Sequence, residues 1–230
     1  MGLILQIETA TSVCSVALAN DGNVIVVKEV NERNVHAEVI TKFIESAINK
    51  AGASFNDLDA VALSSGPGSY TGLRIGTSTA KGICFALDKP LIAVDSLTAM
   101  AQGVTTIESF IDAENLLLCP MIDARRMEVF TTLFDKFMVQ LKPISAEIID
   151  ENSFAALLEK NSILFFGDGA EKCRPVLDQS VNAIFLPNFV NSASFLTKLA
   201  DEKFKEKKFE NLALFEPFYL KDFIAGKKKA

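Results

Sequence analysis

The sequence contains one histidine, His36, among its 230 residues. A single histidine excludes an HExxH motif and every metal site that needs two histidines. Ser69 and Thr71 lie in a glycine-rich segment but lack the GxSxG spacing of a serine nucleophile. His36 is expected near the start of a helix, on its polar side, where a surface histidine is the ordinary interpretation. The residues alone therefore indicate no catalytic set.

Cysteine and long apolar runs are also scarce. The four cysteines are far apart and form no CxxC pair, so we expect buried free thiols in a reducing cytoplasm. No apolar run approaches the roughly 18 residues that a membrane span requires. The first residues, MGLILQIETATS, lack the basic n-region of a signal peptide and are typical of a strand. A cytoplasmic location without membrane contact is expected.

Positive charge is not in excess. The formal net charge of −6 argues against a protein that binds nucleic acid over its whole surface. Lysines do cluster at residues 203–208 and 227–229. We interpret these clusters as a solvated helix face and a tail.

Apolar periodicity predicts the order of elements in the first half. Three strands follow one another, with Asp21-Gly22-Asn23 as a hairpin turn, and Gly52 marks the end of the next helix. The expected ranges are 3–7, 13–19 and 24–30 for these strands, 35–48 for the helix, 60–63 for a fourth strand, 73–87 for a second helix, 90–94 for a fifth strand and 96 onward for a third helix. The order βββαβαβα predicts a mixed sheet with helices on its faces.

The second half repeats the pattern of the first. LILQIETATSVCSVAL and LLLCPMIDARRMEVFTTL each hold an apolar strand, an acid at its end, a small turn and a returning strand. A helix at 154–160, a strand at 163–166, a turn at 167–169 and a long helix at 193–205 are expected next. This similarity predicts a duplicated domain with a boundary near residues 103–114. We expect domains at 1–103 and 104–230, the second one smaller, with the C-terminal segment packing back on the first.

Residues 64–82, SSGPGSYTGLRIGTSTAKG, raise the question of a phosphate site. Glycine-rich turns that open helices often bind anions through backbone N–H groups. This stretch is no Walker A motif, and the three residues between Gly68 and Gly72 make it one residue too long for GxGxxG. A dinucleotide site with Asp95 as its acid is the minor alternative. The main prediction is a tight turn with positive φ at Gly66-Pro67-Gly68 and a close backbone approach at Gly72.

Two acids end the matching strands of the two halves. Glu8 and Asp123 are expected to face each other across a cleft between the domains. Two carboxylates there could hold Mg²⁺ together with a polyphosphate, or they could be ordinary turn acids. The residues leave both interpretations open.

The helix expected at 73–87, LRIGTSTAKGICFAL, has few polar side chains for a surface helix. Glycine inside a helix costs roughly 1 kcal/mol against alanine, so Gly76 and Gly82 need a physical reason. Close packing of another helix on these small residues supplies one. Because a lone domain would leave an apolar groove in water, we expect a partner subunit on the side away from the sheet.

Several segments together closely resemble the bacterial TsaB (YeaZ) family, in the same order and across nearly the whole chain. They are LQIETATSVCSVAL, RNVHAEVITKFIESAI, SSGPGSYTGLRIGTSTAKG, PLIAVDSL, IDARRMEVF and EPFYLKDF, of which GPGSYTGLRIG is the most specific. The resemblance implies a two-domain α/β fold of the actin, sugar-kinase and Hsp70 type (the ASKHA fold), with a βββαβαβα unit in each domain. It also implies a role in making threonylcarbamoyladenosine, at the adenosine beside the anticodon of tRNAs that read codons starting with A.

The resemblance further implies a noncatalytic scaffold. In this family the paralogue TsaD carries the metal-binding histidines and the nucleotide, and transfers a threonylcarbamoyl group from an adenylate onto N6 of adenosine. TsaB pairs with TsaD through first-domain helices, the ATPase TsaE joins them, and tRNA binds through the complex; alone, TsaB forms a homodimer. No firmly bound cofactor or metal is expected, with ATP or ADP and Mg²⁺ only at the junction with TsaD.

The same resemblance implies site residues. Partner binding is expected on the first two helices, at His36, Ile40, Phe43, Gly72, Leu73, Ile75, Gly76, Thr79, Ala80 and Ile83. The loop signature comprises Gly66, Pro67, Gly68, Ser69, Tyr70, Thr71 and Arg74. A vestigial nucleotide or Mg²⁺ site would involve Glu8, Asp123, Gly167 and Gly169. A turn after a strand is the simpler explanation of the last two glycines.

Two other classes of function are alternatives. The first is an ATP-using enzyme in which Glu8 and Asp123 flank Mg²⁺. The family usually has Asp where Glu8 stands, and the longer side chain weakens this alternative. The second is a peptidase, which the single histidine and the missing nucleophile motif disfavour.

Overall fold

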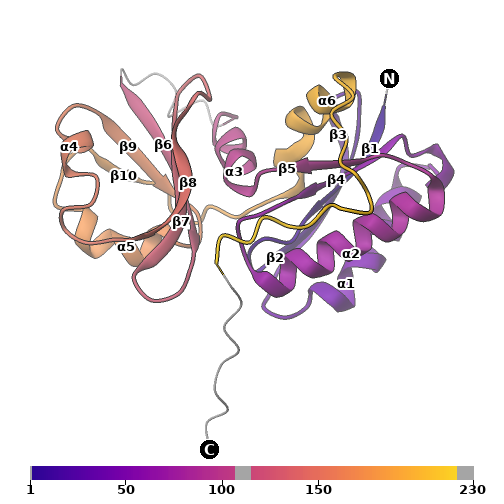
Figure 1. Cartoon of the computed structure of the whole chain (residues 1–230), viewed down its shortest axis with the longest axis horizontal. Helices are drawn as coiled ribbons and strands as arrows, with labels where there is room; N and C mark the ends of the chain where they lie inside the picture. The colour runs from indigo at the N-terminus through magenta and orange to yellow at the C-terminus, as the bar shows by residue number, and fades with distance from the viewer. Residues whose placement is uncertain (1, 107–114, 222–230) are drawn as a thin grey trace, which may run out of the picture.

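The computed structural model describes residues 2–106 and 115–221. It contains two five-stranded mixed sheets, one in each half of the chain, which lie side by side as two lobes (Figure 1). The strand orders are β3-β2-β1-β4-β5 and β10-β9-β6-β7-β8. Counted from the first strand of each half, these are the same order, so the predicted duplication and the two-domain actin-like α/β fold are confirmed.

The first sheet begins as the predicted antiparallel meander. Its strands are β1 (Leu3–Glu8), β2 (Val13–Asn20), β3 (Asn23–Asn31), β4 (Ala60–Ser64) and β5 (Leu91–Val94). The strands β1 to β3 pair antiparallel, whereas β4 and β5 join parallel to β1. Asp21 and Gly22 both have positive φ, as the tight turn between two twisted strands requires.

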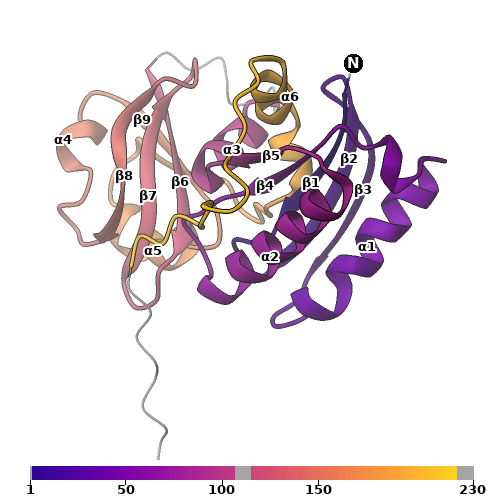
Figure 2. The ribbon, with the colours of Figure 1, turned by 45° about the vertical axis from the view of Figure 1, so that its right-hand side comes forward.

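The helices of the first domain cover opposite faces of this sheet. They are α1 (His36–Lys50), α2 (Tyr70–Leu87) and α3 (Ser96–Val104), with a short 3₁₀ turn, η1, at Phe55–Asp57. The helices α1 and α2 lie side by side on one face, over a core that includes Leu5, Ile7 and Val16 (Figure 2). α3 lies between the two lobes and packs against both sheets. Alternate residues of β1 therefore serve two separate cores.

The second domain repeats the arrangement with shorter helices. Its elements are β6 (Leu116–Asp123), β7 (Glu128–Asp135), β8 (Gln140–Ile148), α4 (Ala155–Leu158), β9 (Ser162–Phe166), α5 (Ala170–Leu177) and β10 (Ala183–Phe185). The helix predicted at 154–160 is thus a single turn. The residue pattern had not located β8, α5 or β10; α5 contains Pro175, and β10 has only three residues.

The long helix that we expected in the second domain packs instead on the first sheet. It consists of a 3₁₀ turn, η3 (Ala193–Leu196), and α6 (Thr197–Lys205). Leu196 and Ala200 are fully buried in the same core as Ile4. The assignment of residues 193–205 to the second domain was therefore wrong, because this apolar face covers the side of the first sheet that α1 and α2 leave open.

Polar contacts hold this returning segment in register on the first sheet. The Ser192 hydroxyl donates to the Glu29 carboxylate on β3 at 2.9 Å, and the Ala193 amide donates to the Ser15 hydroxyl at 2.9 Å. The first domain is consequently built from both ends of the described chain.

Residues 206–221 follow α6 and form an extended segment that we call the C-terminal strap. It crosses from α6 past β5 and along α2 toward the second domain (Figures 1 and 2). Its first anchor is an isolated antiparallel bridge between Glu210 and Leu91 of β5. The lysine cluster at 227–229 lies outside the described residues.

Candidate functional site

The glycine-rich loop positions the start of α2 against the turn between β1 and β2. Gly66 has a φ of +110°, which confirms the predicted tight turn. The Ser69 amide donates to the Ala10 carbonyl at 2.6 Å. The Ser69 hydroxyl accepts from the Gly72 amide at 3.3 Å and so caps the helix. The loop therefore holds a helix in place through contacts within its own chain.

The glycines of this region face the first domain and not a foreign helix. A Cβ atom on Gly72 would lie 2.1 Å from the Thr9 carbonyl oxygen, and one on Gly76 would lie 2.3 Å from the Thr9 hydroxyl. Leu73 and Ala80 are also buried in the chain's own core. The close backbone approach predicted at Gly72 is confirmed. The partner helix that we gave as the reason for Gly76 was wrong, because both glycines allow α2 to approach the β1–β2 turn. These four residues are not available to a partner.

Two of the expected partner contacts on α1 are likewise internal. His36 is only 6% exposed, and its Nε2 atom lies 3.0 Å from the Val13 carbonyl oxygen. The expectation of a surface histidine was wrong, because the imidazole ties the first turn of α1 to the start of β2. Ile40 is buried one turn later.

What remains open is an outer stripe of mostly small residues, with Arg74 and Phe85 as its two large side chains. Four of the expected partner residues, Phe43, Ile75, Thr79 and Ile83, are half-buried and lie at its edge. The stripe itself consists of the exposed residues Thr71, Arg74, Ser78, Gly82, Phe85 and Ala86, which recur every three or four positions along α2. Together these ten residues form what we call the α1–α2 face.

The α1–α2 face combines small residues with one large exposed aromatic ring. Phe85 is 82% exposed, although phenylalanine is usually buried. A Cβ atom on Gly82 would have no neighbour within 4 Å. A helix from another chain could approach such a surface closely and bury the ring. The face is therefore an exposed surface of mostly small side chains with one aromatic ring.

The C-terminal strap borders the α1–α2 face on one side. The Lys81 ammonium donates to the carbonyl oxygens of Ala213 and Phe215, at 3.4 and 3.1 Å. The rings of Tyr70 and Tyr219 stand 4.8 Å apart. α2 is thus partly covered by its own chain, and its outer stripe stays exposed.

A buried acid, Glu8, lies on the side of the first domain that faces the second, within reach of the charge of Asp168. Glu8 is 1% exposed and accepts a hydrogen bond from the Ala10 amide at 2.6 Å. Burial, with a smaller contribution from the nearby charge of Asp168, raises the pKa of Glu8 from its usual value to about 7. A buried carboxyl that is already hydrogen-bonded to the backbone presents little of itself to a metal ion.

Asp123, the expected counterpart of Glu8, is engaged within the second domain. Its carboxylate forms an ion pair with Lys172 and accepts from the Arg125 amide at 2.8 Å. Its amide donates to the Asp168 carboxylate at 2.9 Å. Asp168, named in the sequence only as part of a turn, is thus the second-domain acid whose charge reaches Glu8. The described residues contain no group of three histidine, cysteine or acidic side chains that could hold a metal ion.

The remaining nucleotide candidates are explained by local structure. A Cβ atom on Gly167, whose φ is +107°, would lie 2.2 Å from the Met121 carbonyl oxygen, and one on Gly169 would lie 3.0 Å from the Asp123 amide. Both glycines therefore serve a tight turn against β6. Asp95, the acid of the minor dinucleotide alternative, caps α3 by accepting from the Thr98 amide at 2.8 Å.

The fold defines a class of protein: a two-domain actin-like α/β protein, here with an exposed stripe along α2. The chain matches the model of the TsaD family, described as tRNA N6-adenosine threonylcarbamoyltransferase, over residues 26–228. It is 29% identical to the TsaB protein of Haemophilus influenzae, with 98% of this chain and 96% of that protein aligned. The chain belongs to the TsaD family, within its TsaB (YeaZ) branch.

Solved structures share this fold. YeaZ from Pseudomonas aeruginosa superposes with a TM-score of 0.82 at 23% identity, covering 96% of this chain and all of that one. An activator of 2-hydroxyisocaproyl-CoA dehydratase from Clostridium difficile, with bound ADPNP, has a TM-score of 0.50 at 10% identity, covering 90% of this chain and 97% of that one. Within the described residues, no helix is long and apolar enough to cross a membrane.

Proposed function

We propose that this chain is a noncatalytic subunit in tRNA threonylcarbamoyladenosine biosynthesis that binds and activates a TsaD-type transferase. The transferase places a threonylcarbamoyl group on N6 of the adenosine beside the anticodon, in tRNAs that read codons starting with A. TsaE joins the pair, tRNA binds through the complex, and the chain forms a homodimer when TsaD is absent. The open α1–α2 face is the observation that carries this proposal.

The state of the acid and base side chains supports a noncatalytic role. His36 is buried and hydrogen-bonded to Val13, Glu8 is buried, and Asp123 is paired with Lys172. Each side chain that could take part in catalysis is thus buried or paired within the folded chain. We accordingly place any ATP or ADP with Mg²⁺ at the junction with TsaD and not in this chain's own cleft.

The α1–α2 face is tested by Phe85→Glu, which puts a charge on the exposed ring position without disturbing a buried contact. Burying an unpaired carboxylate in an interface is costly, so we expect association with the TsaD protein of the same organism to weaken at least tenfold, or about 1.4 kcal/mol. Isothermal titration calorimetry with purified TsaD, with and without ATP and Mg²⁺, measures this change.

Val181→Glu is the matched control. Val181 is an apolar residue of the second domain that is 94% exposed, and the substitution introduces the same charge away from α2. The affinity of Val181→Glu for TsaD should equal that of the unaltered chain. Equal binding of TsaD by Phe85→Glu and Val181→Glu would contradict the docking surface. Tight binding of ATP and Mg²⁺ by this chain alone, lost in Glu8→Gln, would favour an enzyme that acts by itself.

A further inference from the structure

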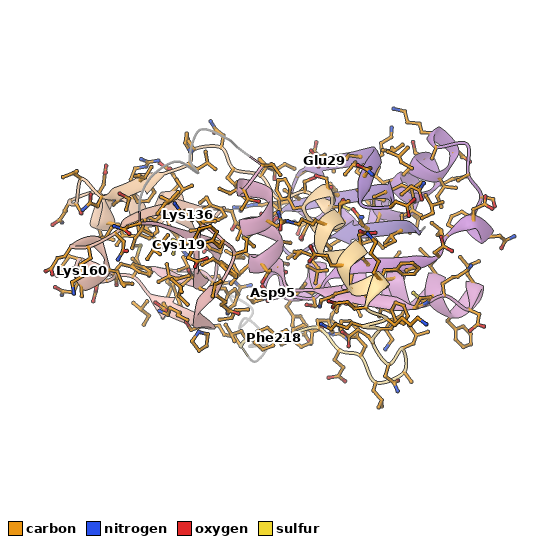
Figure 3. All side chains as sticks on the ribbon, turned by 90° about the horizontal axis from the view of Figure 1, so that it is seen from above. Glu29, Asp95, Cys119, Lys136, Lys160 and Phe218 are labelled. Atoms are coloured by element: carbon orange, nitrogen blue, oxygen red, sulfur yellow. The ribbon has the colours of Figure 1, made fainter. Side chains whose placement is uncertain are left out.

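The C-terminal strap contacts both domains. On the first domain, Leu212 and Phe215 pack against the core beneath α1 and α2. The Phe218 amide donates to the Ser65 carbonyl at 2.7 Å, which fastens the strap to the glycine-rich loop. Phe218 lies at the junction of the two lobes when the molecule is seen from above (Figure 3). The strap therefore reaches the second domain already anchored along the first.

The last two described residues of the strap engage the second domain. Leu220 packs against the apolar cluster formed by α3 and the second sheet, which includes Phe130 and Phe134. The Lys221 ammonium forms an ion pair with the Glu128 carboxylate at the start of β7. The Glu128 backbone carbonyl accepts from Lys172, the partner of Asp123. The strap thus ends beside the β6–β7 turn, which also carries Asp123.

We infer that the C-terminal strap is a tie that sets the opening between the two domains and links this opening to α2. The same short segment contacts Lys81 in the middle of α2, the loop at Ser65 and Gly66, and Glu128 of the second domain. The strap passes very close to Gly66, because a Cβ atom built on Gly66 would lie 2.6 Å from the Phe218 carbonyl oxygen. The strap can therefore move little along the glycine-rich loop. A change in domain opening must therefore pull on the loop that starts α2. This inference does not depend on which partner binds the α1–α2 face.

The tie can be tested at its end, where the ion pair between Lys221 and Glu128 can be removed without disturbing an apolar core. Lys221 and Glu128 are both partly exposed, so Lys221→Glu replaces attraction by repulsion and leaves the fold intact. The domain opening can be followed by pulsed electron spin resonance between spin labels on Lys50→Cys and Lys160→Cys, two exposed sites in different domains. The four native cysteines are buried, which limits labelling elsewhere.

We expect Lys221→Glu to broaden the distance distribution and shift it to longer separations. The charge-swapped pair Lys221→Glu with Glu128→Lys should restore the original distribution. Hydrogen exchange at the Phe218 amide should quicken in the single variant and return to normal in the swapped pair.

Lys208→Glu is the matched control, because Lys208 pairs with Glu206 on the first-domain part of the strap and bridges no domains. It should leave the distribution unchanged. The inference is overturned if Lys221→Glu gives the same distance distribution as the unaltered chain, or the same change as Lys208→Glu.

Discussion

Glu8 shows how one residue can look functional in the sequence and be structural in the fold. It ends β1, and only an exposed carboxylate at this position could hold a metal ion. Here its carboxyl is buried beneath the β1–β2 turn and holds the Ala10 amide. A pKa near 7 means that much of the Glu8 population is protonated at neutral pH.

This position predicts a pH-dependent stability difference. A carboxyl whose pKa rises on folding stabilises the fold fully below its unfolded pKa and loses this contribution as the pH rises through the folded pKa. Glu8→Gln should therefore gain stability over the unaltered chain between about pH 4 and 7, by about 3 kcal/mol at most. Urea unfolding at several pH values measures this difference.

The difference in stability between Glu8→Gln and the unaltered chain reports on the titration of Glu8. Asp95, whose pKa is raised to about 6 by burial, titrates in the same window in both proteins and cancels. A stability difference that does not change between pH 4 and 8 would contradict the assignment.

Two of the three glycines of α2, Gly76 and Gly82, give a second test at the residue scale. Gly76→Ala would place a methyl group 2.3 Å from the Thr9 hydroxyl and should destabilise the fold by about 1–3 kcal/mol. Gly82→Ala, in the same helix, meets no atom within 4 Å and should stabilise it by up to about 1 kcal/mol. Urea unfolding compares the two. A similar effect of both variants would mean that Thr9 does not limit the approach of α2.

At the scale of elements, α2 was located correctly from its sequence, but its environment was not. The paucity of polar residues indicated that both sides of the helix are covered or close to neighbours. That pattern cannot say which residue each glycine contacts. Gly76 lies against Thr9, which is 67 positions away in the sequence, and only the folded chain brings the two together. Only the outer stripe through Gly82 and Phe85 remains for a partner, which is why the variant that tests docking must lie there.

At the scale of the whole molecule, the first domain depends on residues from the end of the chain. η3 and α6 cover one face of the first sheet, and Lys203 donates to the Ala93 carbonyl of β5 at 2.6 Å. The domain that sequence duplication predicts at 1–103 is therefore incomplete. The chain crosses twice between the lobes, and the strap adds a third connection.

This arrangement predicts that a fragment of residues 1–104 does not fold alone, because Ile4, Ala60 and Ile92 would face water. Circular dichroism and amide NMR dispersion measure the outcome. Residues 187–221, joined to the fragment by a flexible linker, should restore a cooperative unfolding transition. A folded, cooperative 1–104 fragment would contradict the role assigned to α6.

The sequence by itself determined the order of strands and helices in the first half, the duplication of the fold, the turn at Gly66 and the family. These features depend on periodicity, glycine and short motifs, which report on neighbours along the chain. Only the tertiary structure decided that α6 completes the first sheet, that Lys172 engages Asp123, that His36 lies inside and that α2 keeps one free stripe. The physical reason is that each of these depends on which distant surface covers a residue, and burial by a distant surface leaves no local pattern.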